Sequence, residues 1–137
     1  MAPLSDLGIL KDVLAADRRV RLAVVFGSAA RNTQGSGSDL DVGVLVEPDS
    51  EAGLPLDVVL SRATGRPVDL VHLDTAPPLL RFEIARDGVV LVERVPHTWA
   101  DFRARAMTDW WDWAPTARML HAAAVSRLRE KVPRGSI

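Results

Sequence analysis

The stretch that decides the fold is Phe26-Gly27-Ser28 followed, after ten further residues, by Asp39-Leu40-Asp41-Val42-Gly43-Val44-Leu45-Val46. Short apolar runs bounded by glycine or turn residues are typical of buried strands. One such run, Arg21–Phe26, stops at Gly27, and the second spans Leu40–Glu47. The sequence therefore predicts two strands connected by a short helical turn and a polar loop.

Asp39 and Asp41 stand two residues apart at the start of the second strand. Side chains at this spacing point to the same face of a sheet, so the two carboxylates repel each other unless a cation lies between them. Carboxylate oxygens suit Mg²⁺, and two ions about 3.5–4 Å apart clamp the attacking and leaving oxygens of a phosphoryl transfer. We therefore predict a two-ion Mg²⁺ site at Asp39 and Asp41, with Gly43 leaving room for a ligand. The alternative interpretation is that Asp39 is only a turn residue and binds no metal.

Gly27 and Ser28 supply the features of a phosphate site. A glycine at a strand end lets a phosphate approach the backbone, and the turn after it presents free N–H groups to anionic oxygens. The Ser28 hydroxyl adds a donor, although the same hydroxyl could serve as a helix cap. Arg31 lies one turn further on, where a phosphate contact and a surface role are about equally expected.

Asp69 is a third candidate carboxylate. It interrupts the apolar run Pro67–Leu73, where an acidic residue needs a partner. Beside the Asp39/Asp41 strand it could bind the metal and take the proton of an acceptor hydroxyl as a general base. His72, on the opposite strand face, is interpreted as a surface or structural residue.

Helical and strand patterns alternate along the chain. Helices are expected at 4–17, 56–62, 78–86 and 98–131, and strands at 21–26, 40–47, 67–73 and 89–94. This order predicts an α/β or α+β fold with a mixed sheet of about four strands and helices mainly on one side. We expect one domain over residues 1–131, with a tail at 132–137 that is either native or an expression-vector remnant.

The helix at 98–131 carries apolar residues at spacings of three and four from Trp99 to Leu128, which predicts one core-facing stripe. Pro115 should kink or divide it. Met107 and Trp111 lie off the stripe and suggest a separate apolar patch, for which a protein-binding surface is an even alternative.

Composition narrows the classes of protein. The chain has 137 residues, a net charge of −1 and no cysteine, which excludes disulfides, thiolate zinc sites and a thiol nucleophile. The near-zero charge argues against broad electrostatic capture of nucleic acid. No apolar run is long enough to span a bilayer, so a soluble cytoplasmic protein is expected.

The Gly-Ser, ten residues, Asp-x-Asp pattern resembles the signature of the polymerase-β nucleotidyltransferase superfamily. More narrowly, nearly the whole chain is similar to the minimal nucleotidyltransferases (MNT proteins) that pair with HEPN-domain toxins as antitoxins. The resemblance implies Mg²⁺ binding by Asp39, Asp41 and Asp69, all three catalytic, and contact of Gly27 and Ser28 with a nucleoside triphosphate. It further implies an adenylyltransferase that moves AMP from ATP onto a tyrosine of a HEPN ribonuclease.

Two alternatives remain open. The same fold could neutralise a toxin by binding alone, without catalysis. It could instead transfer a nucleotide to another acceptor, either a small molecule or RNA.

Overall fold

A computed structural model describes residues 2–27, 39–48 and 53–131. Every helix and strand expected from the sequence within these ranges is present, and the ends differ by at most two residues. The predicted tail at 132–137 falls outside the described residues. In chain order, the elements are α1 (Ala2–Ala16), β1 (Val20–Phe26), β2 (Leu40–Val46), α2 (Leu56–Thr64), β3 (Val68–His72), α3 (Pro78–Asp87), β4 (Val89–Glu93) and α4 (Thr98–Lys131).

The four strands form one mixed sheet in the order β3-β2-β1-β4, as expected. β1 pairs antiparallel with both β2 and β4, whereas β2 and β3 run parallel. The parallel pairing requires a crossover, and α2 provides it. β1 and β2 therefore form the centre of the sheet, and β3 and β4 form its edges.

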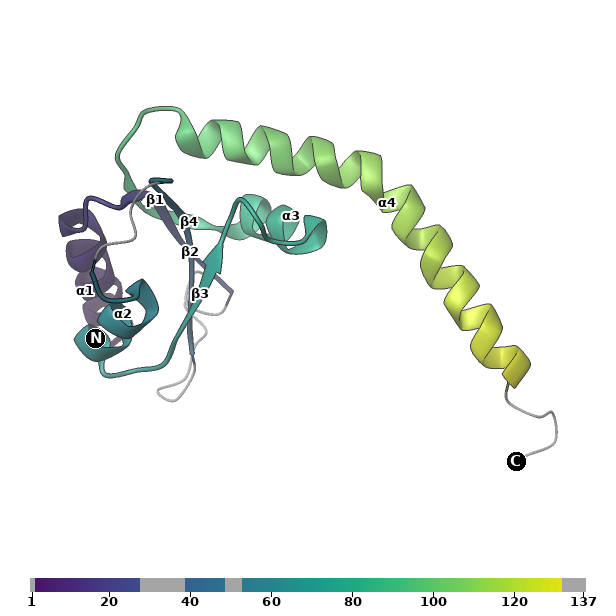
Figure 1. Cartoon of the computed structure of the whole chain (residues 1–137), viewed down its shortest axis with the longest axis horizontal. Coiled ribbons are helices and arrows are strands. Elements are labelled where there is room, and N and C mark those ends of the chain that lie inside the picture. The colour runs from purple at the N-terminus through teal and green to yellow at the C-terminus, as the bar shows by residue number, and fades with distance from the viewer. Residues whose placement is uncertain (1, 28–38, 49–52, 132–137) are drawn as a thin grey trace.

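Helices cover both faces of the sheet, which corrects the expectation that they pack mainly on one side (Figure 1). α1 and α2 pack on one face through Leu10, Leu14 and Leu60, against Val25 and Val42 of the strands. On the other face, Ile84 and Ala85 of α3 and Phe102 and Ala106 of α4 pack against Leu22 and Val24. The cause is that β1 is apolar on both faces, as is usual for a central strand that is buried on each side.

The start of β3 is tied to the first layer of helices. Arg66, just before β3, donates from Nη1 to Oδ2 of Asp6 in α1 at 2.6 Å, and both side chains are largely buried. The Leu40 N–H then donates to the Pro67 carbonyl at 3.0 Å. The ion pair holds the start of β3 against α1, and the Leu40–Pro67 hydrogen bond continues the β2–β3 pairing where both strands begin.

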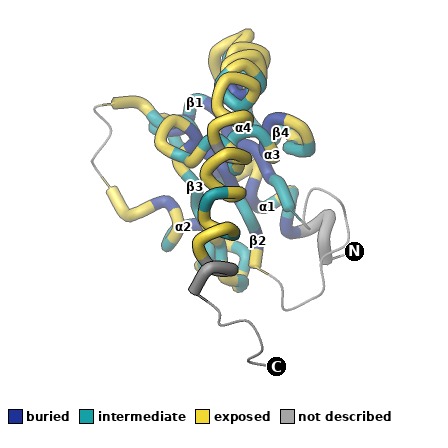
Figure 2. Tube along the Cα trace, turned by 90° about the vertical axis from the view of Figure 1, so that its right-hand side faces the viewer, coloured by how far each residue is buried: buried dark blue, intermediate teal, exposed yellow. Residues whose placement is uncertain are grey.

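Only the first part of α4 packs against the domain. Trp110 stacks on Phe82 of α3, with ring centroids 5.4 Å apart, whereas Trp111 and Met119 are each 72% exposed. Figure 2 shows the distal half of the helix exposed along most of its length. The expectation that one stripe lines the core along the whole helix is therefore wrong, because the helix is longer than the layer it packs on.

Pro115 lies inside α4, which continues through it as one helix. The helix axis bends about halfway along (Figure 1). A bend without a break fits a proline that removes one hydrogen bond and crowds the preceding turn. Among the described helices, none is long and apolar enough to cross a membrane.

Candidate functional site

The predicted carboxylates meet on the face of the sheet that α3 covers. Asp41 of β2 is directly paired with Asp69 of β3 in the parallel register, so their side chains lie on the same face. Asp39 stands two residues before Asp41 and just outside the strand. Asp39 and Asp69 are exposed, whereas Asp41 is half-buried. Asp69 is tolerated in its apolar strand because β3 is an edge strand and exposes this position.

Gly27 lies against the same carboxylate from the other side. Phe26, the last residue of β1, pairs with Asp41, and Gly27 follows with a φ of 67°. A Cβ atom at Gly27 would stand 2.6 Å from Oδ2 of Asp41. Glycine is required here both for its backbone conformation and because the Asp41 carboxylate occupies the space of a side chain.

The electrostatics of the group favour a bound cation. Burial raises the pKa of Asp41 above its ordinary value, and the negative charges of Asp69 and then Asp39 raise it further. A divalent ion would offset all three effects at once. In the described part of the chain, no three acidic, histidine or cysteine side chains converge tightly enough to form a metal-binding group as they stand. The donor chemistry nevertheless fits Mg²⁺, since all three groups present hard carboxylate oxygens.

Gly43 has a different role from the one expected. A Cβ atom at Gly43 would stand 2.6 Å from Cδ2 of Leu73. Leu73 is fully buried and belongs to the core beneath α3 and α4. The missing side chain therefore makes room for a core leucine rather than for a ligand.

A pocket of about 340 Å³ opens beside Asp41. The end of β1 lines one side of the pocket, and one face of α3 lines the other. The lining residues are Phe26, Gly27, Asp41, Leu80, Glu83, Arg86 and Asp87. The α3 residues of this pocket were not predicted from the sequence, because their only signal is a spacing of three to four residues on a helix whose packing is set by the tertiary structure.

Ser28 and Arg31, predicted as phosphate ligands, lie outside the described residues. Gly27 is thus the described part of the predicted phosphate turn. His72 is exposed at the end of β3, in agreement with its interpretation as a surface residue.

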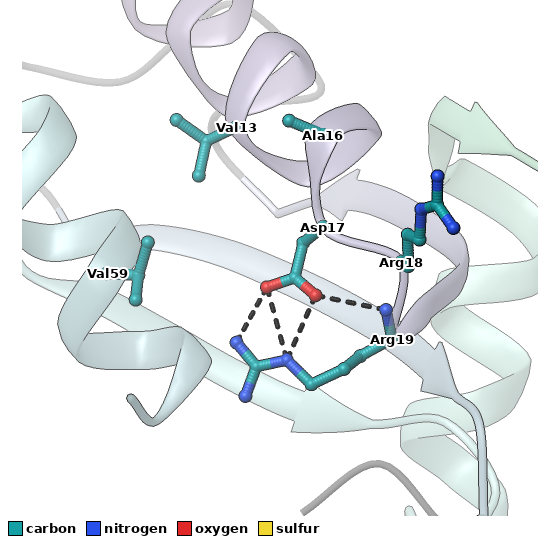
Figure 3. A pocket seen from close by; sticks show the side chains of 6 residues that line it. All are labelled: Val13, Ala16, Asp17, Arg18, Arg19 and Val59. Carbon is teal, nitrogen blue, oxygen red and sulfur yellow. Dashed lines mark hydrogen bonds and ion pairs between the residues drawn. The ribbon is translucent and has the colours of Figure 1, made fainter. Parts of the chain in front are cut away.

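A second pocket of about 440 Å³ lies on the other side of the sheet, between α1 and α2 (Figure 3). Two of its charged groups, Asp17 and Arg19, are paired with each other. Arg19 donates from Nη2 to Oδ2 of Asp17 at 2.6 Å and from Nη1 to the Leu54 carbonyl at 2.9 Å. This pair lowers the pKa of Asp17 and joins the end of α1 to the segment before α2, which indicates a structural role.

Replacing Gly27 by alanine is expected to impair metal binding more than folding. Gly65 is a matched control, since its φ is 68° and an added Cβ there meets no atom within 4 Å. Both Gly27→Ala and Gly65→Ala should lower the free energy of unfolding by about 1–2 kcal/mol, the cost of a left-handed backbone for alanine. Only Gly27→Ala displaces the Asp41 carboxylate.

Thermal unfolding with and without Mg²⁺ or Mn²⁺ separates the two effects. The rise in unfolding temperature on adding the ion should persist in Gly65→Ala and shrink in Gly27→Ala. An equal rise in both variants would show that Gly27 does not shape the metal site.

Comparisons with known proteins identify the family and the fold of this chain. The sequence profile of the family described as polymerase beta, nucleotidyltransferase matches residues 9–97, a range that holds the whole sheet and all three carboxylates. A comparison with curated protein sequences finds no match.

Solved structures with the same fold come from toxin–antitoxin complexes. A chain of a toxin–antitoxin crystal structure with AMP-PNP superposes with a TM-score of 0.67 at 21% identity, over 90% of this chain and 99% of that chain. A chain of the complex between a tri-AMPylated Shewanella oneidensis HEPN toxin and an MNT antitoxin superposes with a TM-score of 0.63 at 21% identity. The match covers 90% of this chain and 99% of that chain. A chain of the toxin–antitoxin complex MntA–HepT superposes with a TM-score of 0.60 at 19% identity, over 90% of this chain and 97% of that chain.

At these identities the structures establish a common fold. The family profile covers more than half of the chain, and the residues that it spans include the paired strands carrying Asp41 and Asp69. This chain belongs to the polymerase beta nucleotidyltransferase family.

Proposed function

We propose that this protein transfers AMP from ATP to a hydroxyl group of a protein partner, a HEPN-domain toxin, and thereby acts as its antitoxin in the cytoplasm. The observation that carries the proposal is the in-register pairing of Asp41 with Asp69, with Gly27 packed against Asp41 from the opposite side. In this proposal, the metal-binding carboxylate of Asp41 lies at one end of the sheet between Asp69, the general base, and Gly27, where a phosphate can approach the backbone.

Each carboxylate has a distinct task in this reaction. Asp39 and Asp41 would hold Mg²⁺ together with Asp69; bound there, Mg²⁺ would neutralise the triphosphate and polarise its reacting phosphate. Asp69 accepts the proton of the acceptor hydroxyl. The acceptor oxygen bonds to the α-phosphorus, the bond from that phosphorus to the β-phosphate bridging oxygen breaks, and pyrophosphate leaves. Positioning and charge neutralisation supply most of the rate acceleration.

Two observations support a protein acceptor. The similar complex from Shewanella oneidensis contains a HEPN toxin that carries AMP groups beside an MNT antitoxin. α4 also exposes Trp111 and, in its distal half, Met119, and large exposed apolar groups are typical of protein-binding surfaces.

The first test is transfer of label from α-labelled ATP, with Mg²⁺ added, to the product of the neighbouring gene co-expressed with this chain, which we expect to be a HEPN-domain toxin. We expect label on the toxin and none with the double variant Asp39→Asn/Asp41→Asn. Label on RNA or on a small molecule instead would overturn the protein-acceptor part of the proposal. A complex that neutralises the toxin equally well with the double variant would favour an antitoxin that acts by binding alone.

The exposed part of α4 gives a separate prediction about the complex. Most of the stability of a helix in a protein comes from tertiary packing, so we expect the toxin to cover the part of α4 that does not pack on its own domain. Trp111→Ala should weaken the complex about tenfold or more, because exposed tryptophans that become buried dominate interface energies. Leu54→Ala is the control, since Leu54 is 54% exposed and lies off α4. Titration calorimetry with the purified toxin measures the affinity of each variant. If Trp111→Ala and Leu54→Ala bind the toxin with equal affinity, the interface lies elsewhere.

A further inference from the structure

The last turns of α3 form one wall of the pocket beside Asp41. Leu80, Glu83 and Asp87 recur at spacings of three and four, with Arg86 beside them, so one face of the helix looks onto the end of β1. Ile84 and Ala85, on the other side of the same turns, are buried in the core. This packing fixes the wall at the site, and none of its residues has a role in the reaction described above.

The order of the strands shows which reactant the wall faces. Asp69, Asp41 and Gly27 follow one another across β3, β2 and β1. In the proposed reaction, on which this inference rests, the acceptor hydroxyl lies at Asp69. The pocket includes Gly27 and Asp41 but not Asp69, so it lies on the side of Asp41 away from the acceptor. It is therefore on the nucleotide side of the reacting phosphate.

The charges of the pocket single out Arg86. Asp41, Glu83 and Asp87 are acidic, and Arg86 is the sole cation among the described residues that line it. Without Arg86, this wall would present only negative charge to a triphosphate. A guanidinium matches the geometry of phosphate oxygens and keeps its charge under all relevant conditions.

Arg86 is held at the pocket by two contacts. Its Nε and Nη2 donate to Oδ2 of Asp87 at 3.0 and 2.8 Å, and its guanidinium lies 5.6 Å from the ring centroid of Phe82. Both hydrogen bonds use the same edge of the guanidinium. Nη1 makes no hydrogen bond within the described part of the chain, which leaves that edge to bind another anion.

We propose that Arg86 binds the β- and γ-phosphates of the nucleoside triphosphate through Nη1 and stabilises the departing pyrophosphate. Asp87 orients the guanidinium from its other edge. The α3 wall thus recognises the leaving group rather than the nucleoside or the acceptor.

The test measures ligand binding without an acceptor, using wild type, Arg86→Ala and Arg86→Lys. The matched control is Arg62→Ala, because Arg62 is an exposed arginine in the last turn of α2, on the opposite face of the sheet. The probes are MgATP, magnesium pyrophosphate and AMP, with affinities from titration calorimetry and unfolding temperatures to confirm folding.

Arg86→Ala should weaken binding of ATP and of pyrophosphate by about tenfold to a hundredfold, while the affinity for AMP changes little. Arg86→Lys should recover part of the lost affinity, since lysine keeps the positive charge but lacks the planar set of donors of a guanidinium. The affinities of Arg62→Ala should equal those of wild type. Unchanged ATP and pyrophosphate affinities in folded Arg86→Ala, or an equal loss for AMP, would overturn this role. Wild type that binds no nucleotide would overturn the proposed function itself, whereas binding of ATP without transfer to protein would leave the role of Arg86 testable by the same titrations.

Discussion

Asp41→Asn is expected to lower the rate of AMP transfer by at least about 10³-fold, equivalent to about 4 kcal/mol of transition-state stabilisation. Asp41 is the central carboxylate of the site: it pairs with Asp69, contacts the position of Gly27 and lines the pocket. An amide at this position has no charge with which to hold Mg²⁺. Single-turnover transfer with saturating ATP and toxin measures the loss, and Asp12→Asn on the exposed side of α1 is the control.

The same substitution should stabilise the metal-free protein. Because the pKa of Asp41 is raised in the folded state by burial and by Asp69 and Asp39, its contribution to stability is present below the unfolded pKa and is lost as the pH rises through the folded pKa. The neutral amide of the variant carries no such cost. In the presence of EDTA, Asp41→Asn should therefore unfold at a higher temperature than wild type at neutral pH, by about 1–3 °C, and at the same temperature in acid.

Added Mg²⁺ should reverse this order. The ion competes with the proton for Asp41, so its stabilising effect on wild type should grow as the pH rises through the raised pKa of Asp41. Unfolding temperatures from about pH 3 to about pH 8, with EDTA or with Mg²⁺, test both statements. If Asp41→Asn is destabilising in EDTA at neutral pH, Asp41 is not the strained carboxylate of this site.

Asp69→Asn is expected to reduce kcat for transfer by about 10²–10⁴-fold, the usual range for loss of a general base. The KM for ATP should change little, because Asp69 does not line the pocket beside Asp41 that we propose for the nucleotide. The residual rate should rise steeply with pH, since a tyrosine acceptor ionises by itself near pH 10, at about its ordinary pKa.

A pH–rate profile of Asp69→Asn with the toxin as acceptor separates this role from a purely structural one. A rate that recovers with pH supports proton transfer to Asp69. A flat profile together with a lost response to Mg²⁺ would show that Asp69 only helps to hold the metal. Asp74→Asn, just beyond β3 and exposed, is the control for a nearby change of charge.

The local patterns predicted the secondary structure closely. The apolar runs Arg21–Phe26, which stops at Gly27, and Leu40–Glu47 marked β1 and β2. In the structure, Gly65 caps α2 in the left-handed conformation. These features depend on residues that are close in sequence, and the backbone responds to them directly. The prediction failed where distant residues decide the outcome. Gly43 accommodates Leu73, which no local pattern near Gly43 could indicate.

The arrangement of the helices also depended on packing. The nearly continuous apolar run of β1 shows that both faces of this strand are apolar. It does not show which helices cover each face, and the helices expected on one side of the sheet lie on both sides. The stripe along α4 was read as core throughout, yet the domain is too small to cover a helix of 34 residues. Its distal apolar groups therefore remain exposed.

The amino-acid sequence by itself determined that Asp41 lies in a strand with Asp39 two residues before it, and that Gly27 ends the preceding strand, because side-chain period and glycine conformation are local properties. Only the tertiary structure decided that Asp69 pairs with Asp41, that Gly27 packs against the Asp41 carboxylate, and that the end of α3 closes the pocket with Arg86. Strand register and helix packing join residues far apart in the chain. They are chosen by burial of the two cores as a whole, so a pattern in any one segment does not contain them.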